Sequence, residues 1–330
     1  TYLRSLIERL DRERFEPWLV CPDHPSIEPL RQTPELDGRV VALPPSPPLP
    51  SFVRSRGGAL RSIRPALVHC ADLDPPMMVA TRLATGTTPL VVTHNTPELR
   101  PTYNVVGRAV VRAAWAARPW TIYTSERDRE TSLALEPIAR ERTAVIPYGV
   151  DLERFAVRNG AAARAALGIG ADRRVVGMVA YLREQKGHTY LLQAAERLAR
   201  RRSDVEWVIV GDGELRGSIE QEAHDRGVAE QVHLLGNRDD VPEILSALDV
   251  FALSSTFEGM CFAVAEALAV EVPVVATDVG GVSQSVVHGE TGLLVPPRDP
   301  AALAEAIERL LDDRDTASRL ARAGRERVRR

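Results

Sequence analysis

Two glutamates eight residues apart, Glu258 and Glu266, lie in the segment of the sequence best suited to chemistry. A strand pattern ends near Leu253, a polar loop follows, and a helical pattern begins near Gly259. Glu258 therefore falls in the strand-to-helix turn, and Glu266 falls two turns along the helix. A carboxylate accepts two hydrogen bonds, so Glu266 could bind a vicinal diol such as that of a sugar. The alternative for each residue is an ordinary surface acid, with Glu258 favouring the helix dipole.

The start of the predicted helix offers a second chemistry, the binding of an anion. The backbone N–H groups of Gly259, Met260 and Cys261 would be exposed there, and a helix N-terminus binds phosphate readily. Lys186 is the only lysine in the sequence, and every other Lys/Arg position is arginine. Either arginine would not serve at this position, or the single lysine is a matter of chance.

Short apolar strand patterns alternate with helical patterns along the whole chain. In the first half we predict strands over 18–21, 39–43, 67–70, 89–93, 120–124 and 143–146. In the second half we predict strands over 174–181, 205–210, 232–235, 249–253, 273–277 and 292–295. The helical patterns cover 2–10, 51–63, 75–85, 104–117, 187–201, 214–226, 240–247, 260–269 and 300–312. Such alternation with β-branched strands is typical of parallel sheets that are covered by helices on both faces.

The two halves of the chain predict two domains. A break near 147–172, interrupted by proline and glycine, separates residues 1–150 from residues 151–330. We predict an α/β protein with two Rossmann-like, doubly wound domains facing a cleft, because ligands of such sheets bind outside the carboxyl ends of the strands. The length of 330 residues fits two domains. The net charge of −3 argues against nucleic-acid binding by bulk positive charge.

Cysteine content and hydropathy bear on the compartment. Three widely spaced cysteines, Cys21, Cys70 and Cys261, form no C-x-x-C pair and favour a reducing cytosol over a disulfide framework. No apolar run approaches the roughly 20 residues that span a bilayer. The mildly basic first half could contact an anionic membrane surface, or it could be an ordinary solvated face. We expect a cytoplasmic protein, either free in the cytoplasm or peripherally bound at the inner face of the membrane.

The segment with the two glutamates strongly resembles family-4 glycosyltransferases, which have the GT-B fold. The shared features are E-x7-E at 258–266, PVVATDVGG at 273–281 and HGETGLLVPP at 288–297. Three further segments are similar to the family: VIPYGVDLERF at 145–155, AYLREQKGHTYLLQ at 180–193 and IVGDGEL at 209–215. In the first half the likeness is looser and depends mainly on 89–97 and 121–127.

The resemblance implies an activity and its substrates. It implies a retaining, metal-independent transfer of a hexose-type sugar from a UDP- or GDP-sugar to a lipid-linked, polysaccharide or other glycan acceptor. The first domain would bind the acceptor, and the second would bind the nucleotide-sugar donor. No cofactor and no nucleic-acid partner are expected. The resemblance also implies a first strand with a glycine-rich loop before Thr1, and a final helix after Arg330.

The family motif assigns roles to particular residues. By position, Lys186 would hold the donor diphosphate, Glu258 would lie against the donor sugar, and Glu266 would bind the nucleotide ribose. The amides at the helix start would meet the phosphate or the sugar. His94, at the end of a first-domain strand, would face the reacting sugar, although a lone strand-end histidine is more often structural. Lys186 and the amides at the helix start would donate hydrogen bonds to the leaving diphosphate and so stabilise its negative charge without a metal.

Some positions depart from the family pattern. Tyr181 stands where a second cation is usual, and Arg183 could supply that charge instead; Asn237 completes the predicted donor-binding set. Glu271 stands where a glycine is usual, and it would strain the turn if that position needs a positive φ. Gln284 stands where a glutamate is frequent.

The sequence is also compatible with other functions. One is a catalytically weak or inactive nucleotide-sugar-binding protein with the same fold. Another is a phosphorylase or epimerase on this fold, but a pyridoxal-phosphate phosphorylase would need Lys186 as its Schiff-base lysine. No D-x-D pair is placed like a metal site. Asp72 and Asp74 come nearest, and we interpret them as loop residues that cap the helix starting at 75.

Overall fold

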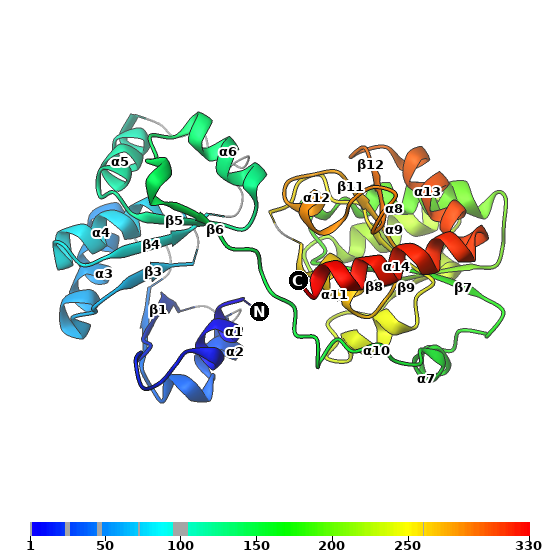
Figure 1. Cartoon of the computed structure of the whole chain (residues 1–330), viewed down its shortest axis with the longest axis horizontal. Helices are drawn as coiled ribbons and strands as arrows, with labels where there is room; N and C mark the ends of the chain where they lie inside the picture. Colours follow the sequence, from blue (N-terminus) through cyan, green and yellow to red (C-terminus); the bar gives the residue numbers. More distant parts are fainter. Residues whose placement is uncertain (1, 24–26, 45–47, 72, 95–104, 260) are drawn as a thin grey trace. The chain divides into compact units, whose positions relative to one another are not determined.

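The computed structural model describes residues 2–23, 27–44, 48–71, 73–94, 105–259 and 261–330. The chain forms two compact units, Thr1–Ile146 and Pro147–Arg330 (Figure 1). Their boundary lies at the start of the 147–172 segment, where the strand and helix patterns are interrupted. Each unit is an α/β structure with parallel strands, as the alternating patterns predicted.

The second unit is built on one parallel six-stranded sheet. Its strands are β7 (Arg174–Val179), β8 (Val205–Val210), β9 (Val232–Leu234), β10 (Val250–Leu253), β11 (Val274–Thr277) and β12 (Leu293–Val295). They are arranged in the order β12-β11-β10-β7-β8-β9. The strand order reverses between β7 and β10, and ligands of doubly wound sheets bind beyond the carboxyl ends of strands at such a switch point. The loops that follow β7 and β10 are therefore where this fold would bind a ligand.

Helices cover this sheet and bury most of its central strands. The helices are α7 (Ala161–Ala166), α8 (His188–Ala199), α9 (Arg216–Asp225), α10 (Val241–Ser246), α11 (Phe262–Ala269), α12 (Val282–Ser285), α13 (Pro300–Asp312) and α14 (Arg314–Val328). All four residues of β10 and all four of β11 are buried. α13 starts where its sequence predicts, because Pro300 occupies the first turn and the Asp299 side chain caps the amides of Ala301 and Ala302.

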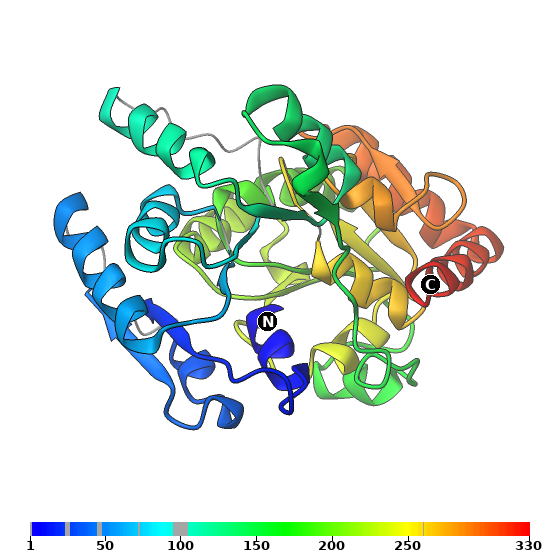
Figure 2. The same cartoon turned by 60° about the vertical axis from the view of Figure 1, so that its left-hand side comes forward.

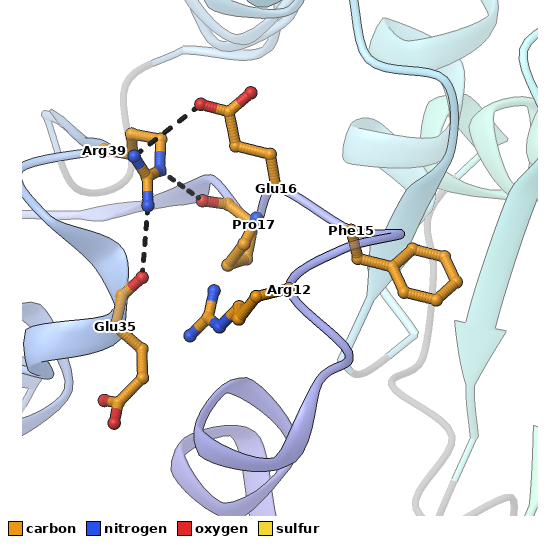
Figure 3. A pocket seen from close by; sticks show the side chains of 6 residues that line it. All are labelled: Arg12, Phe15, Glu16, Pro17, Glu35 and Arg39. Carbon is orange, nitrogen blue, oxygen red and sulfur yellow. Dashed lines mark hydrogen bonds and ion pairs between the residues drawn. The ribbon is translucent and has the colours of Figure 1, made fainter.

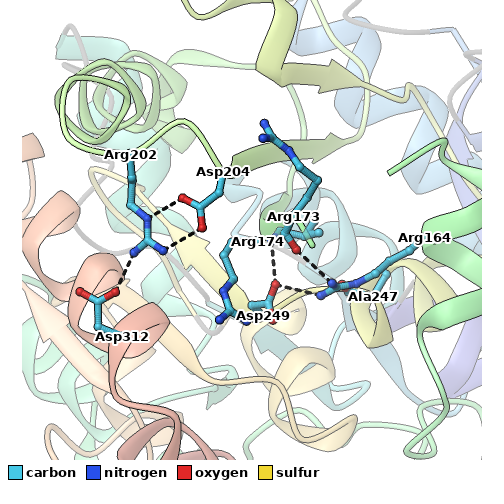
Figure 4. Close-up of polar contacts among 9 residues, drawn as sticks. Arg164, Arg173, Arg174, Arg202, Asp204, Ala247, Asp249 and Asp312 are labelled. Carbon is cyan, nitrogen blue, oxygen red and sulfur yellow. Dashed lines mark hydrogen bonds and ion pairs between the residues drawn. The ribbon is translucent and has the colours of Figure 1, made fainter. Parts of the chain in front are cut away.

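An arginine near the start of the second unit joins α7 to the sheet (Figure 4). Arg164 donates Nε to the carbonyl of Ala247 at 2.8 Å, and Nη2 to Oδ2 of Asp249 at 2.8 Å. Its Nη1 donates to the carbonyl of Arg173 at 3.2 Å. Asp249 Oδ2 also accepts the backbone N–H of Val175 at 2.8 Å. These bonds attach the segment after the unit boundary to the amino ends of β7 and β10.

The first unit holds two parallel sheets. Its strands are β1 (Leu19–Pro22), β2 (Val40–Leu43), β3 (Val68–Cys70), β4 (Leu90–Thr93), β5 (Trp120–Tyr123) and β6 (Thr143–Val145). Within the described ranges, β1 pairs only with β2, while β3, β4, β5 and β6 form a separate sheet in that order. The helices are α1 (Tyr2–Arg9), α2 (Glu28–Arg31), α3 (Leu49–Ile63), α4 (Pro75–Thr85), α5 (Val105–Ala116) and α6 (Glu126–Leu135), and α4 packs against α3 and α5 (Figure 2). Among the described helices, none is both long and apolar enough to cross a membrane.

A shallow hollow in the first unit carries both signs of charge (Figure 3). It is lined by Arg12, Phe15, Glu16, Pro17, Glu35 and Arg39. The Arg39 guanidinium donates to the carbonyls of Pro17 and Glu35, each at 3.3 Å, and lies 3.6 Å from the Glu16 carboxylate. The charge of Arg39 is therefore compensated locally, and none of the predicted site residues lines this hollow.

Glu271 has a left-handed backbone, with φ +60°, in the turn between α11 and β11. This confirms the positive φ considered for the glycine-like position, and such a conformation costs a non-glycine residue about 1 kcal/mol. We expect Glu271→Gly to raise the free energy of unfolding by about 0.5–1 kcal/mol, measured by urea denaturation. The ion pair that this change removes, between Glu271 Oε1 and Arg325 Nε at 3.5 Å, contributes little because it is partly exposed.

Glu271→Ala is the matched control, because it removes the carboxylate but keeps the Cβ that is strained at this φ. We expect no gain in stability from this variant. An equal gain from alanine and glycine would assign the effect to the carboxylate and would contradict the backbone explanation.

Candidate functional site

Lys186 and Glu258 meet at the switch point of the second sheet. Lys186 ends a short 3-10 turn, η4 (Glu184–Lys186), in the segment between β7 and α8, and Glu258 lies in the loop between β10 and α11. Lys186 Nζ is 2.6 Å from Glu258 Oε1, and the side chains are 18% and 6% exposed. Ser255, which the sequence interpretation did not single out, donates its hydroxyl to the same oxygen at 2.7 Å. Two residues predicted to act on one donor are thus in direct contact.

Hydrogen bonds join the loop that carries Lys186 to the loop that carries Glu258. The backbone N–H of Thr256 donates to the carbonyl of Gln185 at 2.8 Å, and Gln185 Nε2 donates to the carbonyl of Phe257 at 3.1 Å. The Ser254 hydroxyl donates to the carbonyl of Lys186 at 3.1 Å. The two loops consequently hold each other in place, which orients both charged side chains before any ligand binds.

Two glycines allow the loops of the site to approach one another closely. Gly187 has φ +64°, and a Cβ on it would lie 2.2 Å from the carbonyl oxygen of Ser254. Gly280 has φ +48°, and a Cβ on it would lie 1.5 Å from the carbonyl oxygen of Glu258. Both distances are far below any van der Waals contact. The Lys-Gly and Gly-Gly segments of the sequence are therefore needed for the backbone geometry of the site.

The helix beside Glu258 begins later than the sequence predicted. α11 starts at Phe262 with Cys261 as its N-cap residue, because the preceding loop is held by a bond from the Gly281 N–H to the Gly259 carbonyl at 3.0 Å. Among the described residues, no side-chain cap hydrogen bond is formed by the N-cap residue, and the start of a helix is suited to binding an anion. Burial and the nearby Glu258 charge raise the pKa of Cys261 to about 12, so its thiol is neutral. The predicted contribution of Met260 lies outside the described residues.

Glu266 lies in the second turn of α11, half-buried. Within the described part of the chain its carboxylate has no hydrogen-bond or ion-pair partner. Burial raises its pKa, and the opposing positive charge of Arg154 does not cancel that effect. A partly desolvated carboxylate without donors is suited to accept hydrogen bonds from a ligand.

We expect Glu266→Gln to stabilise the protein at neutral pH, in proportion to the desolvation of the ionised carboxylate. A raised pKa in the folded state means that stability is lost as the pH rises from the ordinary range of a glutamate through the raised value. The gain in melting temperature should therefore be present at pH 7 and vanish near pH 4. Thermal unfolding across this range measures it, with exposed Glu305→Gln on α13 as the control. A gain independent of pH would contradict this explanation.

The remaining donor-binding candidates lie at the same edge of the sheet. Tyr181 follows β7, is 57% exposed, and has the Arg183 guanidinium 4.9 Å from its ring centroid. Asn237 is exposed and follows β9, two strands away from β7 in the sheet. Its neighbour Gly236 bridges to Gly211 after β8. These side chains are consequently available to a ligand that extends along the carboxyl ends of β7, β8 and β9.

His94 lies in the first unit, directly after β4, as predicted. Its side chain is 5% exposed, and its Nε2 is 3.7 Å from Oε2 of Glu136, whose side chain is 7% exposed. Its ring lies 5.8 Å from that of Tyr123. Sequence reasoning did not single out Glu136, which lies 42 positions later, directly after α6. The contact of His94 with a substrate remains a prediction.

The D-x-D segment has a structural role at Asp74. Its side chain accepts the backbone N–H of Met77 at 3.0 Å and caps α4, as expected, whereas Asp72 lies outside the described residues. In the portion of the chain that the structure describes, no three His, Cys, Asp or Glu side chains are grouped to hold a metal ion.

His188 is a buried histidine of the site region, directly after Lys186 and Gly187. Its side chain is 2% exposed at the first position of α8, and within the described residues neither ring nitrogen has a hydrogen-bond partner. Burial and the Lys186 charge lower its pKa to about 4, so the ring is neutral. It does not cap the helix, because Gly187 is the N-cap residue and no side chain forms a cap bond.

Comparison with known proteins agrees with this geometry. Residues 161–327 match the family described as "Glycosyl transferases group 1", and residues 1–154 match "Glycosyltransferase Family 4". A sucrose-phosphate synthase structure from Thermosynechococcus elongatus superimposes with a TM-score of 0.81 at 26% identity, covering 99% of this chain and 88% of that one. The fold class is thus GT-B, with two Rossmann-like domains, as predicted.

Two curated relatives each match this chain over about half of its length. A GDP-mannose-dependent α-(1-6)-phosphatidylinositol monomannoside mannosyltransferase of Mycobacterium tuberculosis is 37% identical over 194 residues, 55% of this chain and 50% of that protein. The UDP-Gal:α-D-GlcNAc-diphosphoundecaprenol α-1,3-galactosyltransferase of Escherichia coli is 35% identical over 178 residues, 52% of this chain and 46% of that protein. The matches thus span half or less of these relatives' length. With its family match covering more than half of its residues, the chain belongs to the glycosyl transferases group 1 family.

Proposed function

We propose that the protein transfers a hexose-type sugar from a nucleoside-diphosphate sugar to a glycan or lipid-linked acceptor, with retention of configuration and without a metal or cofactor. The observation that carries the proposal is the Lys186–Glu258 pair at the switch point. It lies beside the start of α11, the helix on which Glu266 has no partner among the described residues.

The chemistry of the proposed reaction matches these side chains. Breaking the sugar–phosphate bond leaves negative charge on the diphosphate and positive character on the sugar. Lys186 and the first amides of α11 would stabilise the diphosphate, and exposed Arg183 would add a cation near the end of β7. Glu258 would accept hydrogen bonds from the sugar, and Glu266 from the ribose.

The relatives support the class of donor. The Mycobacterium tuberculosis protein is named for GDP-mannose, and the Escherichia coli protein is named for UDP-Gal. Both names specify a lipid-linked acceptor, phosphatidylinositol monomannoside in one and diphosphoundecaprenol in the other. We propose the acceptor site in the first unit, near His94, and a cytoplasmic protein with peripheral contact at the membrane.

A second candidate is a nucleotide-sugar-binding protein with little or no turnover. Tyr181 favours it, because this exposed aromatic side chain stands where the resemblance implies a second cation. The site would then bind the donor but stabilise the leaving diphosphate less well.

Calorimetric titration with UDP and with GDP, in the presence of EDTA, tests the proposal. We expect micromolar binding of one nucleotide by the unaltered chain and much weaker binding by Lys186→Ala. Arg200→Ala is the control, because Arg200 pairs with Glu196 on the exposed side of α8. Binding that requires Mg²⁺ would contradict metal independence. Binding without any release of nucleoside diphosphate from the matching sugar nucleotide would favour the second candidate.

A further inference from the structure

The Lys186 ammonium has two competing uses. The proposed function assigns it to the donor diphosphate, yet its Nζ is 2.6 Å from Glu258 Oε1. A diphosphate can take this ammonium only by weakening the contact with Glu258 or by sharing it. The affinity of the site for phosphate therefore depends on whether Glu258 finds another hydrogen-bond donor when Lys186 binds the ligand.

Glu258 cannot readily move away to water. Its side chain is 6% exposed, and its backbone carbonyl is packed against Gly280. Ser255 donates to Glu258 Oε1, and the carbonyl of Ser255 in turn accepts the hydroxyl of Thr277 at 2.7 Å. A carboxylate held this way loses much of its stabilisation if its cation leaves without a replacement.

A sugar attached to the diphosphate supplies such a replacement, because its hydroxyl groups donate hydrogen bonds. Both contacts of Glu258 end on Oε1, and within the described residues Oε2 accepts no hydrogen bond. A sugar nucleotide can therefore satisfy Lys186 with phosphate and Glu258 with hydroxyls at the same time. A free nucleoside diphosphate satisfies only Lys186.

We propose that Glu258 is a specificity-determining residue that makes the site prefer the intact sugar nucleotide over the free nucleoside diphosphate. It does so by competing for Lys186 whenever no sugar hydroxyl takes the place of the ammonium. After transfer the sugar is gone, Glu258 recovers Lys186, and the nucleoside diphosphate is released more readily. This inference rests on the proposed function, and it assigns to Glu258 an effect on product affinity that sugar contact alone would not produce.

Titrations with UDP, UDP-glucose, GDP and GDP-mannose test the inference. For the base that binds, we expect Glu258→Gln to bind the nucleoside diphosphate about tenfold more tightly than the unaltered chain, because Lys186 is free. The preference for the sugar nucleotide should fall by at least the same factor. Ser255→Ala should act in the opposite direction, weakening nucleoside diphosphate binding about two- to threefold, because Glu258 then depends more on Lys186.

Thermal unfolding with inorganic pyrophosphate separates this effect from a purely structural ion pair. Glu258→Gln should melt at a lower temperature than the unaltered chain, and pyrophosphate should raise its melting temperature more than that of the unaltered chain. Asp204→Asn is the matched control, because it leaves Arg202 with Asp312 alone at the amino end of β8 (Figure 4). Pyrophosphate should raise the melting temperature of Asp204→Asn no more than that of the unaltered chain.

The outcomes distinguish the inference from the proposed function. Nucleotide binding that Lys186→Ala weakens but that Glu258→Gln leaves unchanged or weakens would overturn the inference and leave the donor site standing. A stronger binding of nucleoside diphosphate by Ser255→Ala would also overturn it. Failure of the unaltered chain and of every variant to bind any of the four nucleotides would overturn both.

Discussion

Lys186→Ala is expected to lower turnover at least ~100-fold, because removing one oriented donor to a developing negative charge costs about 3 kcal/mol of barrier. Lys186 is held for this role by the hydrogen bonds between its loop and residues 254–257. The measurement is release of nucleoside diphosphate from whichever sugar nucleotide the protein binds, at saturating donor. A fall in kcat, and not only in affinity, would place the lysine in stabilisation of the transition state.

The same change leaves Glu258 nearly buried without its cation, so a loss of stability must be separated from a loss of chemistry. Melting temperatures of the variant and of Arg200→Ala provide that comparison, and turnover is measured well below both. Turnover of Lys186→Ala within tenfold of the unaltered protein would rule out the proposed role.

Gly280→Ala is expected to destabilise the second unit by at least ~3 kcal/mol and to weaken nucleotide binding at least tenfold. The added Cβ would overlap the carbonyl oxygen of Glu258 at 1.5 Å, and it would meet a φ of +48°. The clash is with backbone, so it can be relieved only by displacing the loop that carries Glu258. Urea denaturation and calorimetric titration measure the two effects.

Gly289→Ala separates the clash from the backbone conformation. Gly289 also has a positive φ, +77°, but a Cβ there has no atom within 4 Å. We expect a loss of only about 1 kcal/mol, from the left-handed conformation, and unchanged nucleotide binding. Equal losses from the two variants would show that φ, and not the approach to Glu258, governs Gly280.

The strand patterns were sufficient to predict the strands, but not the separation of β1-β2 from the other strands of the first unit, nor the contacts at the strand ends. Each predicted strand overlaps an observed one, because buried parallel strands are short, apolar and β-branched. Lys186 and Glu258 were each predicted from motif position, yet they are 72 residues apart in sequence. Their contact at 2.6 Å follows from the pairing of β7 with β10, which no local pattern encodes.

Helices α6 and α14 were not predicted, because few large apolar side chains mark their inner faces. α14 is rich in arginine, and its buried residues are Ala317, Leu320, Ala321 and Gly324, so only one large apolar side chain marks its inner face. α6 buries Asp128 and Ser132 instead of apolar residues. The strand predicted over 174–181 ends at Val179, which leaves Tyr181 exposed beyond the ladder.

The three buried cysteines make the natural chain a ready background for site-specific labelling. Cys21, Cys70 and Cys261 are buried, and burial raises the pKa of each, to about 12 for Cys70 and Cys261. At neutral pH their thiols are almost wholly protonated, and maleimides react with the thiolate. A cysteine introduced at Leu83, which is 70% exposed, would then react alone. Paired with a second one at Val157 in the second unit, it would carry two fluorophores for measuring the distance between the two units with and without a sugar nucleotide.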